Sequence, residues 1–152
     1  MKLRIYIILI SISLSGCSFP IRNGVFSIEQ GITGQVLWKE GNHMPSPGGR
    51  FTAITKPVEK EIVVYEMTNK SQAKAFGPFF SDIKTALIAK VKSTKTGFFQ
   101  VELPVGTYSV FSVEPGGLFA NSFDGKGNIQ LVEVTKGAKI HIDFAIDYMA
   151  SY

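Results

Sequence analysis

Cysteine is almost absent from this chain of 152 residues: the only one, Cys17, lies at the end of the longest apolar run. A single thiol cannot form an intramolecular disulfide, so burial of apolar side chains must hold the fold together. Histidine is nearly as scarce, and neither His43 nor His141 has a second ligand at the spacing of a zinc site. We therefore expect no metal, no cofactor and no catalytic residue.

An excess of charge of one sign is also missing. The chain has 16 Lys plus Arg against 12 Asp plus Glu, and 14 against 12 once Lys2 and Arg4 of the N-terminal run are set aside. No dense Lys/Arg block occurs, so there is little electrostatic reason to bind nucleic acid, and we expect no such partner. The locally basic stretch from Lys84 to Lys95 is interpreted as a solvated strand face.

The first 16 residues have the order of an export signal. Lys2 and Arg4 precede an apolar run, and the small residues Ser15 and Gly16 stand just before Cys17. The apolar part has roughly 10 residues, half of the roughly 20 that a membrane-spanning helix needs. We therefore expect residues 1–16 to be a signal peptide that is removed.

The tetrad Leu14-Ser15-Gly16-Cys17 resembles the lipobox of bacterial lipoproteins. This resemblance implies cleavage between Gly16 and Cys17, a diacylglyceryl group on the Cys17 thiol and acylation of the new amine; an ordinary signal peptide or a core strand that contains a cysteine is the alternative. Several acyl chains attach a protein stably, so the expected partner is a membrane. Residues 17–29 would be the lipidated N-terminus and tether. With no Asp after Cys17, the resemblance points to the outer membrane and a side facing the periplasm.

The remaining chain alternates apolar and polar residues, with Gly, Pro, Asn and Asp about every ten residues. This pattern is typical of an antiparallel sandwich or barrel. We predict one all-β domain over 30–152, an antiparallel β-sandwich of about seven strands with long irregular loops at 39–60 and 68–80. The strands are expected at 32–38, 62–67, 98–103, 107–113, 129–134 and 139–148, and in the second half of 81–93, where a helix is the alternative. This last strand would form a hairpin with the strand that starts at residue 98.

The stretch "STKTGFFQVELPVGTYSVF", residues 93–111, resembles the carboxypeptidase regulatory-like domains, a transthyretin-like β-sandwich family. The stretch "GITGQVLW", residues 31–38, is similar to that family's first strand. Pro104 and Gly106 would end one strand and start another, and the ring of Tyr108 would cap the core. The resemblance implies a domain that accompanies metallocarboxypeptidases without holding their catalytic site.

The catalytic motifs of the related enzymes do not occur in this chain. His43 is followed by Met-Pro-Ser and His141 by Ile-Asp-Phe, so neither forms the His-x-x-Glu pair of the peptidases. The chain ends in "YMASY", unlike the Tyr-Arg-Gly-Ser-like tail of transthyretin-like hydrolases. We therefore expect that the chain is not an enzyme.

The segment "PGGLFANSFDGKGN", residues 115–128, places large apolar residues among polar ones. These side chains would either plug the sandwich or stand on a loop tip as a contact surface. We take as candidate contact residues Leu118, Phe119, Asn121, Phe123 and Asp124. Asp124 with Asn128 offers one carboxylate where a calcium loop has several, so no metal is expected there.

Two functions follow as hypotheses. The first is a lipid-tethered, non-catalytic module with a structural or interaction role, whose partner is another envelope protein. The alternative is a ligand-binding lipoprotein, for example for glycans, with Trp38, Tyr65 or Phe119 as stacking faces. An enzyme would require a paired acid and base, and the sequence offers none.

Overall fold

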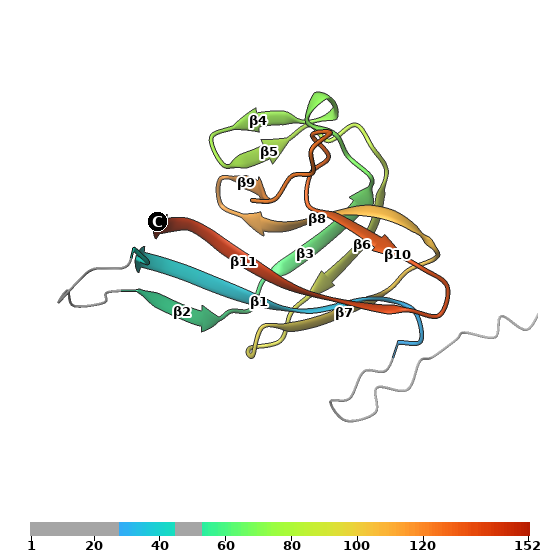
Figure 1. Ribbon diagram of the computed structural model, residues 1–152, viewed down its shortest axis with the longest axis horizontal. Helices are drawn as coiled ribbons and strands as arrows, with labels where there is room; N and C mark the ends of the chain where they lie inside the picture. The colour runs from blue at the N-terminus through green and yellow to red at the C-terminus, as the bar shows by residue number, and fades with distance from the viewer. Residues whose placement is uncertain (1–27, 45–52) are drawn as a thin grey trace, which may run out of the picture.

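The computed structural model describes residues 28–44 and 53–152 (Figure 1). The predicted signal peptide, Cys17 and nearly all of the tether lie outside these residues. The prediction of an all-β sandwich dominated by antiparallel pairs is confirmed. Within the described ranges, no helix has the length and apolar character needed to cross a membrane.

The elements are β1 (Gly31–Asn42), β2 (Ile54–Pro57), β3 (Glu61–Glu66), η1 (Lys70–Gln72, one 3₁₀ turn), β4 (Lys74–Phe76), β5 (Phe79–Ser81), β6 (Leu87–Lys92), β7 (Phe98–Glu102), β8 (Gly106–Glu114), β9 (Gly117–Phe119), β10 (Leu131–Val134) and β11 (Lys139–Ser151).

Two sheets face each other. In sheet A, β1 pairs with β11 on one side and with β2 and β7 on the other; in sheet B the order is β4-β5-β9-β8-β3-β6, and β10 also pairs with β8. One pair departs from the predicted antiparallel arrangement, because β1 and β11 run parallel from Gly31 opposite Lys139 to Asn42 opposite Ser151. The chain leaves β10 in sheet B and crosses to sheet A, so β11 begins beside the start of β1.

The hairpin predicted between β6 and β7 is wrong: the turn joins two sheets. Strand β6 pairs with β3, whereas β7 pairs with β1. The two strands lie in opposite layers, so Val91 of β6 and Phe99 of β7 pack into the space between the sheets from its two sides. The turn is tight, because the Gly97 N–H donates to the Thr94 carbonyl at 2.8 Å. Gly97 has a φ of +78°, and a Cβ there would lie 2.5 Å from the Val36 carbonyl oxygen.

The main core fills the space between the sheets. Its largest fully buried side chains come from both layers, with Phe99 and Phe144 in sheet A and Phe119 in sheet B. The predicted role of Tyr108 is confirmed: the ring is 6% exposed, and its hydroxyl donates to the Pro104 carbonyl at 2.9 Å. That bond ties the start of β8 to the turn that precedes it.

The predicted loops carry more regular structure than expected. Strand β1 continues to Asn42 and β2 follows at Ile54–Pro57, while η1, β4 and β5 occupy most of the other loop; residues 45–52 lie outside the described residues. Strand β2 extends sheet A beside β1, whereas the structure at 68–80 covers a second apolar cluster on the opposite face of sheet B, formed by Val63, Phe80, Phe111, Ala120 and Ile129. Strand β3 is apolar on both faces, so its outer face needs a cover, which these segments supply.

Candidate functional site

The predicted contact loop divides between the interior and the surface. Phe119 is 1% exposed, and its ring centroid lies 5.3 Å from that of Tyr148, so Phe119 plugs the main core. Leu118 is half-buried against the second cluster. Phe123 is 41% exposed, and the Lys70 Nζ lies 3.8 Å from its ring centroid. Only the outer part of this segment therefore presents an aromatic ring at the surface.

Asp124 shapes the turn that follows. Its Oδ1 accepts from the backbone N–H groups of Lys126 at 2.9 Å and Asn128 at 2.8 Å, and its Oδ2 accepts from Asn128 Nδ2 at 2.7 Å. The bonds from Asn128, its backbone N–H first, hold the pKa of Asp124 below its ordinary value. Both carboxylate oxygens are thus engaged by the turn itself.

Asn121 covers part of the edge of sheet A. Its Nδ2 donates to the Ala145 carbonyl at 3.2 Å and to Asp147 Oδ1 at 2.8 Å. Strand β11 is the edge strand of its sheet, so the side chain blocks a backbone carbonyl that would otherwise accept from another strand.

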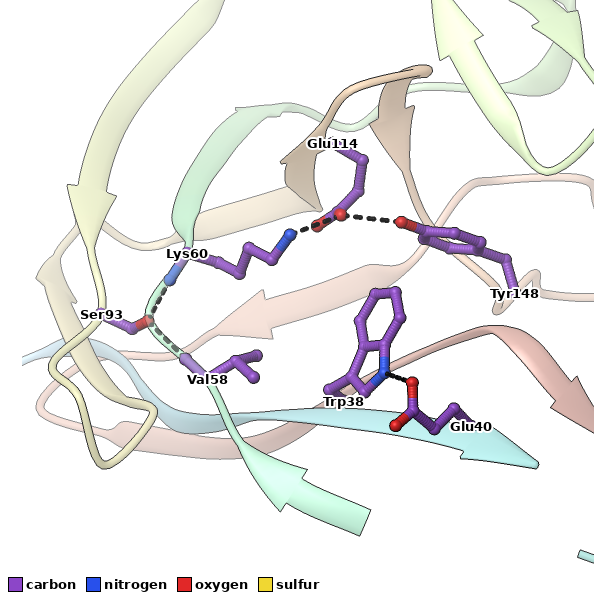
Figure 2. Close-up of polar contacts among 7 residues, drawn as sticks. All are labelled: Trp38, Glu40, Val58, Lys60, Ser93, Glu114 and Tyr148. Atoms are coloured by element: carbon purple, nitrogen blue, oxygen red, sulfur yellow. Dashed lines mark hydrogen bonds and ion pairs between the residues drawn. The ribbon is translucent and has the colours of Figure 1, made fainter. Parts of the chain in front are cut away.

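A buried ion pair lies where the two sheets meet beside this loop (Figure 2). The Lys60 Nζ is 2.6 Å from Glu114 Oε2, and the Tyr148 hydroxyl donates to the same oxygen at 3.1 Å. The Glu114 side chain is fully buried, whereas that of Lys60 is 24% exposed. Burial first, then the charge of Glu114 and this hydrogen bond, raise the pKa of Tyr148 to about 12. The phenol is therefore a neutral donor at ordinary pH.

Neighbouring groups fix the position of Lys60. The Ser93 hydroxyl accepts from the Lys60 N–H at 2.8 Å and donates to the Val58 carbonyl at 3.1 Å (Figure 2). The Lys60 ammonium lies 5.6 Å from the centroid of the Trp38 ring, within the range of a cation–π contact. Trp38 meets Tyr148 edge to face at 5.2 Å and donates from Nε1 to Glu40 Oε2 at 2.7 Å.

This set of side chains connects the two sheets. Trp38 and Tyr148 come from sheet A, Glu114 ends β8 of sheet B, and Lys60 precedes β3. Both donors bind Glu114 Oε2, whereas Oε1 is buried without a hydrogen-bond partner in the described part of the chain, so the carboxylate is only partly compensated. Sequence reasoning missed the ion pair, whose signal is a glutamate at the end of an otherwise uncharged strand.

The histidines and the proposed stacking aromatics do not converge. His141 is exposed on the edge strand β11, beside Asp143 at 3.3 Å, whereas His43 follows the far end of β1. Among the residues that the structure describes, no three His, Cys, Asp or Glu side chains gather as a metal site would require. Trp38 packs on the main core and Tyr65 on the second cluster, while Phe119 is buried. These three rings therefore form no common face.

A surface groove that the sequence analysis missed lies on sheet B. It has a volume of about 510 Å³ and is lined by Glu66, Met67, Ile88, Val105, Thr107 and Tyr108. Three of these are large apolar side chains with high exposure: Met67 at 47%, Ile88 at 41% and Val105 at 59%. The Met67 N–H donates to the Thr107 carbonyl at 3.1 Å, which holds two walls together. The sequence feature that could have indicated this groove is Val105, an apolar residue in the turn of "LPVGTY".

Comparison of the chain with protein-family models, with curated proteins and with solved structures gives no match.

Proposed function

We propose that this chain is a non-catalytic, lipid-anchored module of the bacterial cell envelope, and that its β-sandwich binds a protein partner through the groove at Met67, Ile88 and Val105. The observation that carries the proposal is the exposure of these three apolar side chains, which come from three separate segments yet line one concavity. A partner that covers these three side chains would remove their apolar surface from water and gain the hydrophobic contribution.

The occupant that suits this groove is an extended segment of another envelope protein. Strand β6 ends the strand order of sheet B and, in the described part of the chain, pairs only with β3. Ile88 belongs to this strand and also lines the groove. A peptide in the groove would contact Met67, Ile88 and Val105 across the three segments, and its continuation past Ile88 would reach the free edge of β6, where backbone hydrogen bonds can form.

The anchor is the second part of the proposal. The lipobox-like tetrad ending at Cys17 supports attachment through acyl chains, with the outer membrane as the expected site. Residues 18–30 span at most about 45 Å when fully extended, so the sandwich would work close to the membrane surface. The resemblance to carboxypeptidase regulatory-like domains supports an accompanying rather than a catalytic role.

A pull-down tests whether the groove binds a protein partner. The native protein, tagged after Tyr152, is crosslinked gently in envelopes, solubilised in detergent and analysed by mass spectrometry. We expect a stoichiometric protein that is lost in Val105→Ser and Met67→Ser and kept in Val113→Ser. Val113 is a matched control because it is also an exposed valine, 38% exposed, near the other end of β8. Recovery of the same partner with the groove variants, or of no protein at all, would overturn the groove as a binding site.

Fractionation and mass spectrometry test the anchor separately. The mature protein is expected to begin at Cys17 and to carry the mass of the diacylglyceryl and acyl groups. The Cys17→Ser variant is expected to leave the membrane fraction. If that variant stays wholly with membranes, the lipid anchor is refuted and the groove proposal is unaffected.

A further inference from the structure

Two segments far apart in the sequence form one side of the molecule, which we name the basic cap: residues 68–86 and 120–130. Backbone bonds join them, from Lys70 N–H to the Gly127 carbonyl at 3.0 Å and from Ile129 N–H to the Thr68 carbonyl at 2.9 Å. The Asn69 amide adds bonds to the Lys126 carbonyl and to Asn128 Oδ1. In Figure 1 the cap comprises η1, the β4–β5 hairpin and the adjoining turn, beyond β9.

The charge of the cap differs in sign from that of the remaining domain. The cap holds four lysines, Lys70, Lys74, Lys84 and Lys126, against the two aspartates Asp82 and Asp124. The other described residues hold eight lysines against ten carboxylates. In the described residues no cap lysine forms an ion pair, whereas Lys56, Lys60, Lys90 and Lys92 each have a carboxylate partner. The carboxylate of Asp124 is also occupied by its own turn.

The cap also carries a highly exposed aromatic ring. Phe76 ends β4, directly before the Gly77–Pro78 turn, and is 82% exposed, the largest value among the exposed large apolar side chains. Lys74 lies on the same face of β4, because side chains two apart in a strand share a face. The cross-strand partner of Phe76, Phe79, lies on the same face and packs at 5.0 Å from the Tyr148 ring, which fixes the hairpin against the sandwich.

We propose that the basic cap rests on an anionic phospholipid surface, with the Phe76 ring in the boundary between headgroups and acyl chains and the cap lysines against the phosphates. Aromatic rings with lysines around them are the composition of interfacial membrane contacts, and each lysine near an anionic leaflet contributes about 1 kcal/mol, or roughly fivefold in affinity. A Phe ring without a polar group gains more from this boundary than from water. The contact uses neither the groove nor the lipid on Cys17, so it stands apart from the proposed function.

The test uses the chain from residue 17 onward with Cys17→Ser, which retains every described residue and removes the apolar leader that would itself bind vesicles. Flotation is compared on vesicles of phosphatidylethanolamine with phosphatidylglycerol and on phosphatidylcholine alone. We expect binding only to the anionic vesicles. The variant with Lys70, Lys74, Lys84 and Lys126 all changed to Gln should lose at least about tenfold in affinity.

The matched control changes Lys39, Lys95, Lys136 and Lys139 to Gln, an equal change of net charge at four positions outside the cap that, like the cap lysines, form no ion pair with the described residues. This control should retain most of the binding, and Phe76→Trp should show a blue-shifted emission on anionic vesicles relative to the parent. Equal losses in the two quadruple variants would overturn the proposal, because they would assign binding to net charge alone. An unshifted emission of Phe76→Trp on anionic vesicles would also overturn the proposal. Binding that does not depend on phosphatidylglycerol would overturn it as well, and so would an acidic protein that binds the cap in place of vesicles.

Discussion

The ammonium group of Lys60 lies 2.6 Å from a carboxylate oxygen of Glu114, although the Glu114 side chain has no exposure to solvent. The two residues are 54 positions apart in the sequence. The pair therefore joins the start of β3 to the end of β8, and the Tyr148 hydroxyl extends the connection to sheet A. A buried charge is tolerated only when such partners compensate for the lost hydration.

Removal of the positive partner should destabilise the fold. Lys60→Met leaves the Glu114 charge buried without its main partner, and we expect a loss of about 3 kcal/mol, the low end for a buried pair because Lys60 is partly exposed. Replacement of both residues, Lys60→Met with Glu114→Leu, should recover most of the loss, since no charge then remains to be buried. Urea denaturation of the four proteins measures the coupling. Additive effects in the double variant would show that the pair is not coupled.

The phenol of Tyr148 should make the stability fall at high pH. Its pKa is raised to about 12 in the folded state from 10.0, so its contribution is fully present below pH 10 and is lost as the pH rises from 10 to 12. In this window the unfolded state loses the proton while the folded state keeps it. The free energy of unfolding of Tyr148→Phe should fall less steeply than that of the parent across the same range. Parallel curves would contradict the assignment.

Phe119 is expected to be the most important residue of the candidate contact loop for stability. Phe119→Ala should cost about 3 to 5 kcal/mol, because it leaves a cavity in the main core. Phe123→Ala, from the exposed end of the same loop, should cost less than about 1 kcal/mol. Thermal melts of both variants make the comparison. A Phe119→Ala protein that melts like the parent would favour the contact-surface interpretation of this residue.

Asn121 should protect the chain from self-association more than it stabilises the fold. Asn121→Ala uncovers the Ala145 carbonyl on the edge strand β11, so we expect a concentration-dependent shift toward dimers or larger species. The free energy of unfolding should change by less than about 1 kcal/mol, because the lost bonds are exposed. Light scattering over a dilution series measures the shift, with Ser122→Ala as the control. Identical behaviour of the two variants would exclude a protective role for Asn121.

Local patterns in the sequence predicted most of the strands. The alternation from Ile140 to Tyr148 marks β11, and the turn at Pro104 and Gly106 precedes β8 as expected. The same patterns could not predict which strands pair, because pairing depends on the packing of both layers together. The parallel β1–β11 pair and the crossing between β6 and β7 were missed for this reason.

The sites were harder to predict than the strands. Lys60 with Glu114, and Met67 with Ile88 and Val105, are brought together only by the three-dimensional fold, and no spacing rule relates them. For the segment 115–128 the sequence left open whether its apolar side chains plug the sandwich or form a contact surface, and burial assigns Phe119 to the core and Phe123 to the surface. Such a division depends on which side of sheet B each ring faces.

Site-specific photocrosslinking in living cells tests the central claim, that the groove on sheet B binds a protein partner. A photoreactive amino acid is placed at Val105, and at Lys136 on an exposed turn as the control. We expect one discrete adduct with another envelope protein from position 105 and none from position 136. No adduct from position 105, or the same adducts from both positions, would contradict it.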